Sequence, residues 1–291
     1  MTGSKCHFAS AFALAAVSFA TVVRAQNSPN ATASLVAQAQ SDARILSAAP
    51  DAPVAALEWR NTLRGTVGVR IPIVGALHST GFLLQLPAQI ELHNADQAQP
   101  VPWQYWRGRL ALEAAYRAAV ASAARPLVLA ATFAIEHESD HASTGEPGLV
   151  NLNSLSLRGD LSTALGPHVF TAALLTRLHV LTCTRHPIYC GNYGGGAGSV
   201  TFETALDLVF DARLSLSSPF RFFAALHGGW LVANALALQE RRLALHLGFA
   251  VRPEQRGLFQ LYATGQLGED VGYFRYNGPQ AQFGGGFRWG W

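Results

Sequence analysis

Long runs of alternating apolar and polar residues dominate this sequence. In residues 199–214, Val200 and Phe202 alternate with Glu203 and Asp207. Side chains two positions apart lie on one face of a β-strand, so this segment has one apolar and one polar face. The same alternation recurs in residues 81–92 and 241–252. The pattern indicates β-strands with one buried or lipid-facing side.

About twelve predicted strands follow one another, each near the roughly ten residues that a tilted strand needs to cross a membrane. They cover residues 53–61, 64–73, 81–92, 108–117, 126–141, 149–161, 168–182, 199–214, 219–230, 241–252, 257–265 and 280–291. The predicted fold is an all-β transmembrane barrel, antiparallel and up-and-down, over residues 51–291. Alternation alone also fits a soluble β-sandwich with one solvated face.

The connections between the predicted strands favour the barrel, because short and long links alternate as in outer-membrane barrels. The short links lie near residues 118–125, 164–168, 215–219 and 252–256. The longer links lie at residues 93–107, 140–149, 183–198, 231–240 and 266–279. In such barrels the short turns face the periplasm and the long loops face outward.

Charged residues are scarce, yet those on the predicted polar faces balance in sign. Only 13% of the residues are charged, against about a quarter in ordinary soluble domains. Unpaired charges in a narrow lumen would be costly, so we expect ion pairs and not a wide pore, which disfavours a solute channel. The formal charge of +3 gives no sign of nucleic-acid binding. The residues predicted to point inward are Arg70, Arg109, Glu113, Arg117, Arg158, Asp160, Arg177, Glu203, Asp207, Asp211, Arg213, Arg221 and Arg242.

The first 25 residues predict a cleaved signal peptide. Lys5 precedes an apolar run over residues 8–23, and small residues precede a cleavage site after Ala25. An uncleaved anchor is the alternative, but the run is shorter than the roughly 20 residues of a membrane-spanning helix. Residues 26–50 are rich in Ala, Ser, Gln and Asn, which predicts a periplasmic linker.

Export bears on the two cysteines of the mature chain. Cys183 and Cys190 lie close in sequence, and an oxidising compartment favours a disulfide between them. His186 lies between them, so a zinc site is the alternative, but the cluster offers only three ligands. We therefore predict a disulfide, no metal site and no cofactor.

The C-terminal segment has aromatic residues at alternate positions up to the last residue. Phe283, Phe287, Trp289 and Trp291 resemble the C-terminal strand signal that the barrel-assembly machinery recognises in bacterial outer-membrane proteins. The resemblance implies that this machinery is a partner and that the protein is located in the outer membrane of a Gram-negative envelope.

A polar cluster interrupts the apolar face of the strand at residues 126–141. By alternation His137 and Ser139 share the lipid-facing side of this strand with its apolar residues. A hairpin centred near residue 145 sets Ser139 opposite Asn151 and His137 opposite Asn153. Polar groups facing hydrocarbon are costly unless they lie at headgroup level and bond to one another or to lipid.

The spacing of Phe133, His137 and Ser139 is similar to the motif of the outer-membrane lipid A deacylases. The resemblance implies ester hydrolysis, with His137 as general base, Ser139 as nucleophile and an outer-membrane lipid or lipopolysaccharide as partner. That family carries a Glu on the following strand, and the residue at its spacing here is Asn151. Asn can orient a histidine but cannot offset imidazolium charge.

The mature chain as a whole resembles a family of bacterial outer-membrane β-barrels of unknown function. The resemblance lies in residues 67–75, 83–94 and 150–152 and in His137, Ser139 and His141. It implies a barrel but no activity, so the polar cluster is open to a purely structural interpretation as an interfacial girdle. Three hypotheses remain: a barrel without an assigned reaction, a lipid A-directed esterase, and a small-solute channel.

Overall fold

The computed structural model describes ten segments of the chain. They are residues 29–49, 55–60, 62–93, 105–120, 126–142, 150–183, 199–233, 238–253, 257–268 and 280–290. The predicted signal peptide and residues Cys190 and Trp291 lie outside them, so the cleavage and the disulfide stay predictions.

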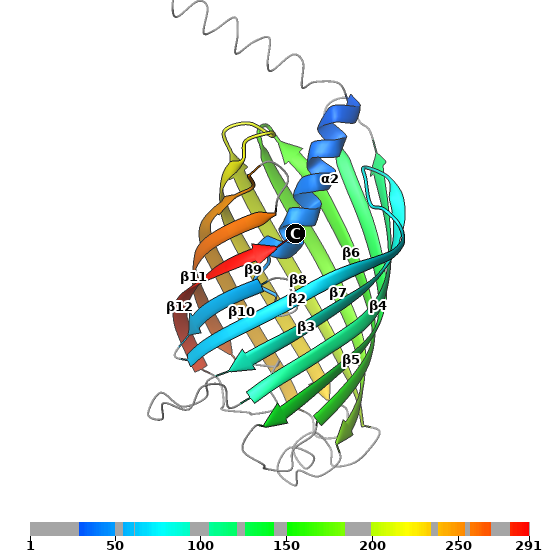
Figure 1. Ribbon diagram of the computed structural model, residues 1–291, viewed down its shortest axis with the longest axis vertical. Helices are drawn as coiled ribbons and strands as arrows, with labels where there is room; N and C mark the ends of the chain where they lie inside the picture. Colours follow the sequence, from blue (N-terminus) through cyan, green and yellow to red (C-terminus); the bar gives the residue numbers. More distant parts are fainter. Residues whose placement is uncertain are drawn as a thin grey trace, which may run out of the picture.

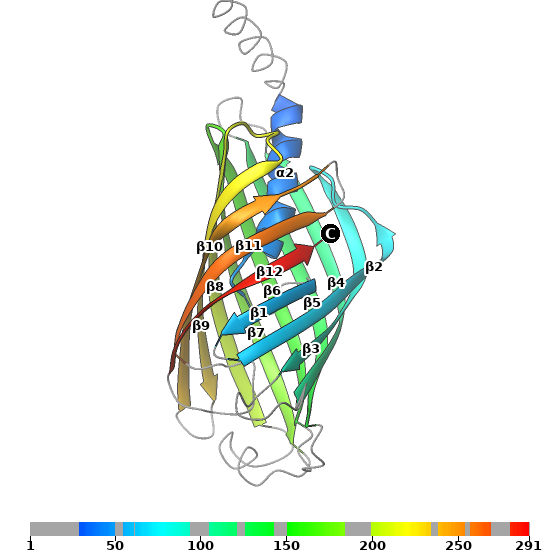
Figure 2. The same ribbon diagram turned by 60° about the vertical axis from the view of Figure 1, so that its left-hand side comes forward.

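Twelve antiparallel strands form one closed barrel in which each strand pairs with its neighbours in sequence (Figure 1). β1 pairs with both β2 and β12, and this closes the sheet (Figure 2). The strands are β1 (Ala55–Arg60), β2 (Thr62–Gly75), β3 (Gly81–His93), β4 (Tyr105–Val120), β5 (Leu127–Ala142), β6 (Val150–Leu165), β7 (His168–Cys183), β8 (Ser199–Arg213), β9 (Phe220–Ala233), β10 (Leu238–Val251), β11 (Leu258–Gly268) and β12 (Gln280–Gly290). The predicted number and order of strands are confirmed.

The alternation in the sequence is the alternation between the outside and the lumen of this barrel. On β5, Phe133 and Ile135 face outward and are 47% and 52% exposed, whereas Thr132 and Glu136 face the lumen and are buried. Because the strands form a single closed sheet, the outward apolar side chains are left for acyl chains to cover. This excludes the alternative of a β-sandwich.

The segment predicted to be a linker is instead an α-helix inside the barrel. Helix α2 (Pro29–Leu46) runs into the lumen from one end, as both views show (Figures 1 and 2). Proline at the first helical position suits a helix start, because its missing N–H would have no partner there. The sequence does not reveal this helix by hydrophobic periodicity, because a helix that packs against a polar lumen wall needs no large apolar stripe.

Apolar residues of α2 pack against two patches of the lumen wall. Val36 contributes to a cluster with Val128 and Val169, close to the ends of β5 and β7. Ile45 and Leu46 form a second cluster with residues of β8 to β11. The fit is tight at Gly290, where an added Cβ would lie 2.6 Å from Ile45 Cγ2.

Polar residues of α2 fix the helix along its length. Asp42 is fully buried and accepts hydrogen bonds from Arg221 and Arg252 of the barrel. Arg44 donates to Glu113 and to Asp160, at 2.9 Å and 3.2 Å. A buried carboxylate between two arginines is strongly stabilised by them, so α2 is a plug held by charge and not a loose tail.

The rest of the described lumen carries the predicted network of ion pairs. Arg158 donates to Asp207 at 2.7 Å, and the same carboxylate bonds to His227 at 2.6 Å. Arg177 bonds to Glu203 at 3.0 Å. The plug and these pairs fill much of the interior of the barrel.

Within the described segments, no helix is long and apolar enough to span a membrane. Nor do three or more His, Cys, Asp or Glu side chains of these segments cluster in a way that could hold a metal ion.

Candidate functional site

The candidate site lies on the outer wall of the barrel, near the ends of β5 and β6. His137 and Ser139 point outward from β5, as their alternation with the buried Glu136 requires. The pairing of β5 with β6 sets His137 opposite Asn153 and Ser139 opposite Asn151. The register predicted from the sequence is therefore confirmed.

A hydrogen bond joins two of these side chains across the strands. His137 Nδ1 lies 2.9 Å from Asn153 Oδ1. Because an amide oxygen only accepts, His137 Nδ1 carries the proton and donates it. In the neutral tautomer with the proton on Nδ1, the lone pair lies on Nε2. The pair has the arrangement of a base with an orienting group.

An apolar groove of about 360 Å³ runs beside this pair on the outer wall. His137 and Asn153 line it together with Leu110, Ile135 and Leu155. Its other lining residues are Leu86, Ala111, Leu112, Glu136, Ser154, Leu178 and Val180. The groove therefore offers hydrocarbon contacts directly next to the imidazole of His137.

The strand on the other side of β5 leaves space next to Ser139. In the β4–β5 pairing, Gly108 stands opposite Ser139, and Leu110 stands opposite His137. Gly108 has no side chain to cover the outer wall at this position. A substrate group can therefore approach the hydroxyl from the side of β4.

The lumen network supports the site from behind. Glu136, which precedes His137, accepts hydrogen bonds from Ser156 at 2.6 Å and from Arg109 at 2.7 Å. Ser154, which follows Asn153, bonds to His179 at 2.7 Å. Both site strands are thus fixed by buried polar contacts immediately next to the outward residues.

The predicted third member, Asn151, pairs with Ser139 in the register, but its side chain lies outside the described part of the structure. The side chain that bonds to His137 is that of Asn153. The predicted register already contained this partner, because it set Asn153 opposite His137. The family spacing pointed instead to Asn151, two residues away. The roles of His137, Ser139 and Asn151 stay predictions.

Comparison with known proteins identifies no family. No family model matches the sequence, and no curated protein matches it. Among solved structures, the Salmonella typhi outer-membrane phospholipase dimer with bound calcium is 13% identical, with a TM-score of 0.48 over 87% of this chain and 98% of that one. The Escherichia coli outer-membrane phospholipase A is 14% identical, with a TM-score of 0.47 over 81% and 96%.

A third similar structure is the β domain of the Bordetella autotransporter BrkA, at 14% identity and a TM-score of 0.42 over 82% of this chain and 98% of that one. The closed barrel with an apolar outer wall and a polar lumen is itself the architecture of outer-membrane proteins. The protein is an integral β-barrel of the outer membrane.

Proposed function

We propose that this protein hydrolyses acyl esters of lipids in the outer leaflet of the outer membrane. Ser139 is the nucleophile, His137 is the general base, and Asn153 orients the imidazole. The observation that carries the proposal is the 2.9 Å hydrogen bond from His137 Nδ1 to Asn153 Oδ1 on the lipid-facing wall.

The His137–Asn153 contact differs from the neighbouring outward pairs of the same two strands. Phe133 stands opposite Leu157, and Ile135 stands opposite Leu155, so the two preceding outward-facing residue pairs of β5 and β6 are apolar. A polar amide or hydroxyl moved into hydrocarbon costs about 2 kcal/mol or more unless it is paired. A catalytic role would explain why His137 and Asn153 are polar, and side-chain packing would not.

The chemistry follows from the tautomer of His137. Nε2 takes the proton of the Ser139 hydroxyl while Oγ attacks the ester carbonyl, and the resulting imidazolium returns the proton to the leaving alcohol. Water then attacks the acyl-serine, again with His137 as base, and releases the fatty acid. Asn153 holds the ring in place through Nδ1, although an amide cannot offset the imidazolium charge as a carboxylate would.

The groove favours a lipid substrate over a soluble ester. An acyl chain that lies along Leu110, Ile135 and Leu155 stays among apolar groups, because these residues face the hydrocarbon layer. The substrate therefore need not leave the membrane to reach Ser139. The chemical class is an acyl ester with a long alkyl chain, which is found in both phospholipids and lipid A.

The test is hydrolysis by the refolded full-length protein in two kinds of vesicle. One kind contains phosphatidylethanolamine, and the other also contains lipopolysaccharide; released fatty acids are identified by mass spectrometry. We expect release by the wild type and a loss of about a thousandfold or more in Ser139→Ala. Thr176→Ala is the matched control, because Thr176 is another hydroxyl on the outer wall, on β7.

The arm that releases fatty acid identifies the substrate lipid. Lipid A shortened by an acyl chain would indicate the deacylase reaction, and lysophospholipid would indicate hydrolysis of phospholipid esters. Intact lipids in both arms, with a correctly folded wild-type barrel, would refute the proposal. Equal activity in Ser139→Ala and wild type would refute the assigned nucleophile.

The structure gives no support to the alternative of a solute channel. Helix α2 occupies the lumen, and its Asp42 and Arg44 are held by the barrel wall. A conducting path would require this plug to leave, with its buried carboxylate separated from Arg221.

A further inference from the structure

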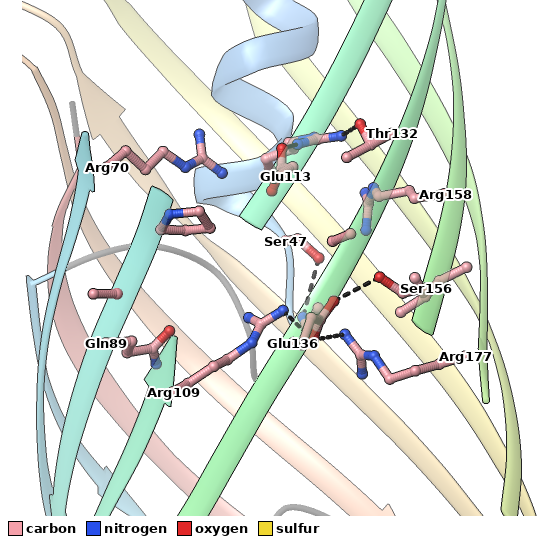
Figure 3. Close-up of a pocket in the computed structure, with 16 residues that line it drawn as sticks. Ser47, Arg70, Gln89, Arg109, Glu113, Thr132, Glu136, Ser156, Arg158 and Arg177 are labelled. Carbon is pink, nitrogen blue, oxygen red and sulfur yellow. Dashed lines mark hydrogen bonds and ion pairs between the residues drawn. The ribbon is translucent and has the colours of Figure 1, made fainter. Parts of the chain in front are cut away.

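A second cavity lies inside the barrel, beyond the end of α2, and it is separate from the outer-wall site. Its volume is about 60 Å³, which is space for roughly four to six water molecules at 10–15 Å³ each. Figure 3 shows arginine side chains reaching it from several strands. Among the residues that the structure describes, five guanidinium groups and two carboxylates line it, namely Arg44, Arg70, Arg109, Arg158 and Arg177 with Glu113 and Glu136.

The carboxylate of Glu113 is already engaged by other groups. Its Oε1 accepts hydrogen bonds from Arg44 at 2.9 Å and from Gln85 at 3.0 Å. These two donors bring Glu113 toward α2 and β3. Arg70 makes no hydrogen bond or ion pair with it.

The carboxylate of Glu136 is engaged as well. Its Oε2 lies 2.7 Å from Arg109 and 3.4 Å from Arg177, and its Oε1 accepts from Ser156. Both oxygens therefore face donors that are fixed on neighbouring strands. Glu136 neutralises Arg109, but it is not hydrogen-bonded to Arg70.

Arg158 and Arg177 also form ion pairs with carboxylates that do not line the cavity. Arg158 bonds to Asp160 at 2.9 Å and to Asp207 at 2.7 Å. Arg177 bonds to Glu203 at 3.0 Å. Three of the carboxylates that pair with these two arginines therefore do not line the cavity, and only Glu136, which contacts Arg177, does.

Arg70 is the arginine that remains. It makes no hydrogen bond or ion pair to any residue that the structure describes, and its buried Nε has no partner there. The residue opposite it on β3 is Pro87, which offers no acceptor side chain. Arg70 is half-buried, and a partly desolvated guanidinium without an acceptor is less stable than a paired one. The cavity therefore has a position that an anion would stabilise.

We propose that this cavity binds a small oxyanion, a phosphate or carboxylate group, through Arg70. The planar fork of a guanidinium matches two oxygens of such a group. The volume of about 60 Å³ suits one group of this size. The bound anion would join β2 to the end of the plug, because Arg44 and Ser47 of the α2 segment also line the cavity.

The test is titration of the detergent-solubilised full-length barrel with inorganic phosphate and, separately, with acetate, at constant ionic strength adjusted with chloride. Isothermal titration calorimetry reports binding in both arms, and the tighter arm identifies the preferred anion. We expect saturable binding to the wild type and a tenfold or greater loss of affinity in Arg70→Gln, since one charge-assisted contact is worth about that much.

Arg241→Gln is the matched control because it removes the same charge from an exposed position over Trp230, outside the lumen. It should bind the anion as the wild type does. Equal weakening in both variants would mean a general charge effect and would overturn the proposal. So would unchanged affinity in Arg70→Gln, or no saturable binding of either anion to the wild type.

Crystals of the wild type soaked in selenate give a readout that needs no variant. Anomalous density between Arg70 and Arg109 would support the site even if Arg70→Gln failed to fold. Selenate found on the surface alone would refute it. Neither measurement involves lipid hydrolysis, so the anion site and the outer-wall site succeed or fail separately.

Discussion

The two faces of β5 hold their polar residues in opposite ways. On the inner face, Thr132 and Glu136 are buried and bond to groups from α2, β4 and β6. On the outer face, His137 bonds to Asn153 among leucine and isoleucine side chains. The inner contacts join many elements, whereas this outer bond joins one strand to its neighbour.

The difference separates polar residues that build the barrel from those that need another explanation. Removing an inner carboxylate leaves arginines buried without partners, which is costly. Replacing His137 and Asn153 by apolar residues leaves no buried charge without a partner. The position would then resemble the apolar residue pairs next to it. Inner substitutions should therefore impair folding, and outer ones should impair only a reaction.

Substitution of His137 should give the largest effect. His137→Ala removes the base, and the rate of lipid ester hydrolysis should fall about a thousandfold or more. The free energy of unfolding should stay within about 0.5 kcal/mol of the wild type, as at most surface sites. Fatty acid release and urea titration in the same vesicles measure both quantities.

A large loss of stability in His137→Ala would break the comparison between the two faces. It would mean that the outer pair is a structural clamp, the interfacial girdle that the sequence also permits. Wild-type activity in this variant would instead remove His137 from the reaction.

The adjacent residue should give the opposite result. Glu136→Ala leaves Arg109 without its carboxylate and removes the acceptor of Ser156. Breaking a buried pair costs about 3–5 kcal/mol, so the urea midpoint should fall clearly. Glu136→Gln keeps the volume and one acceptor oxygen and should lose less. Unchanged unfolding of Glu136→Ala would show that the lumen pairs do not stabilise the barrel.

Alternation predicts most of the barrel from the sequence, because a period of two assigns each residue to a face. It also predicts the pairing of His137 with Asn153, since the centre of the hairpin fixes the register. Helix α2 was not predictable in this way. Its environment is a polar wall, so alanines, Gln40 and Asp42 are buried where an ordinary helix would carry leucines.

Side-chain partners in the lumen were predictable in kind but not individually. Charge balance indicates an ion-pair network, yet it does not show that Glu113 bonds to Arg44 and leaves Arg70 without an acceptor. That choice depends on α2, which brings Arg44 into the barrel from a segment with no strand pattern. The cavity beside Arg70 is a consequence of the plug.

The smallest effect should come from Asn153, which orients the base without taking part in proton transfer. Asn153→Ala frees the His137 ring, and misorientation of this kind lowers rates by about tenfold to a hundredfold. Asn151→Ala should stay near the wild-type rate, because the 2.9 Å contact belongs to Asn153. Hydrolysis rates of the two variants, measured side by side in the more active vesicle, decide which asparagine serves the histidine. A greater loss in Asn151→Ala would assign the role by family spacing and not by register.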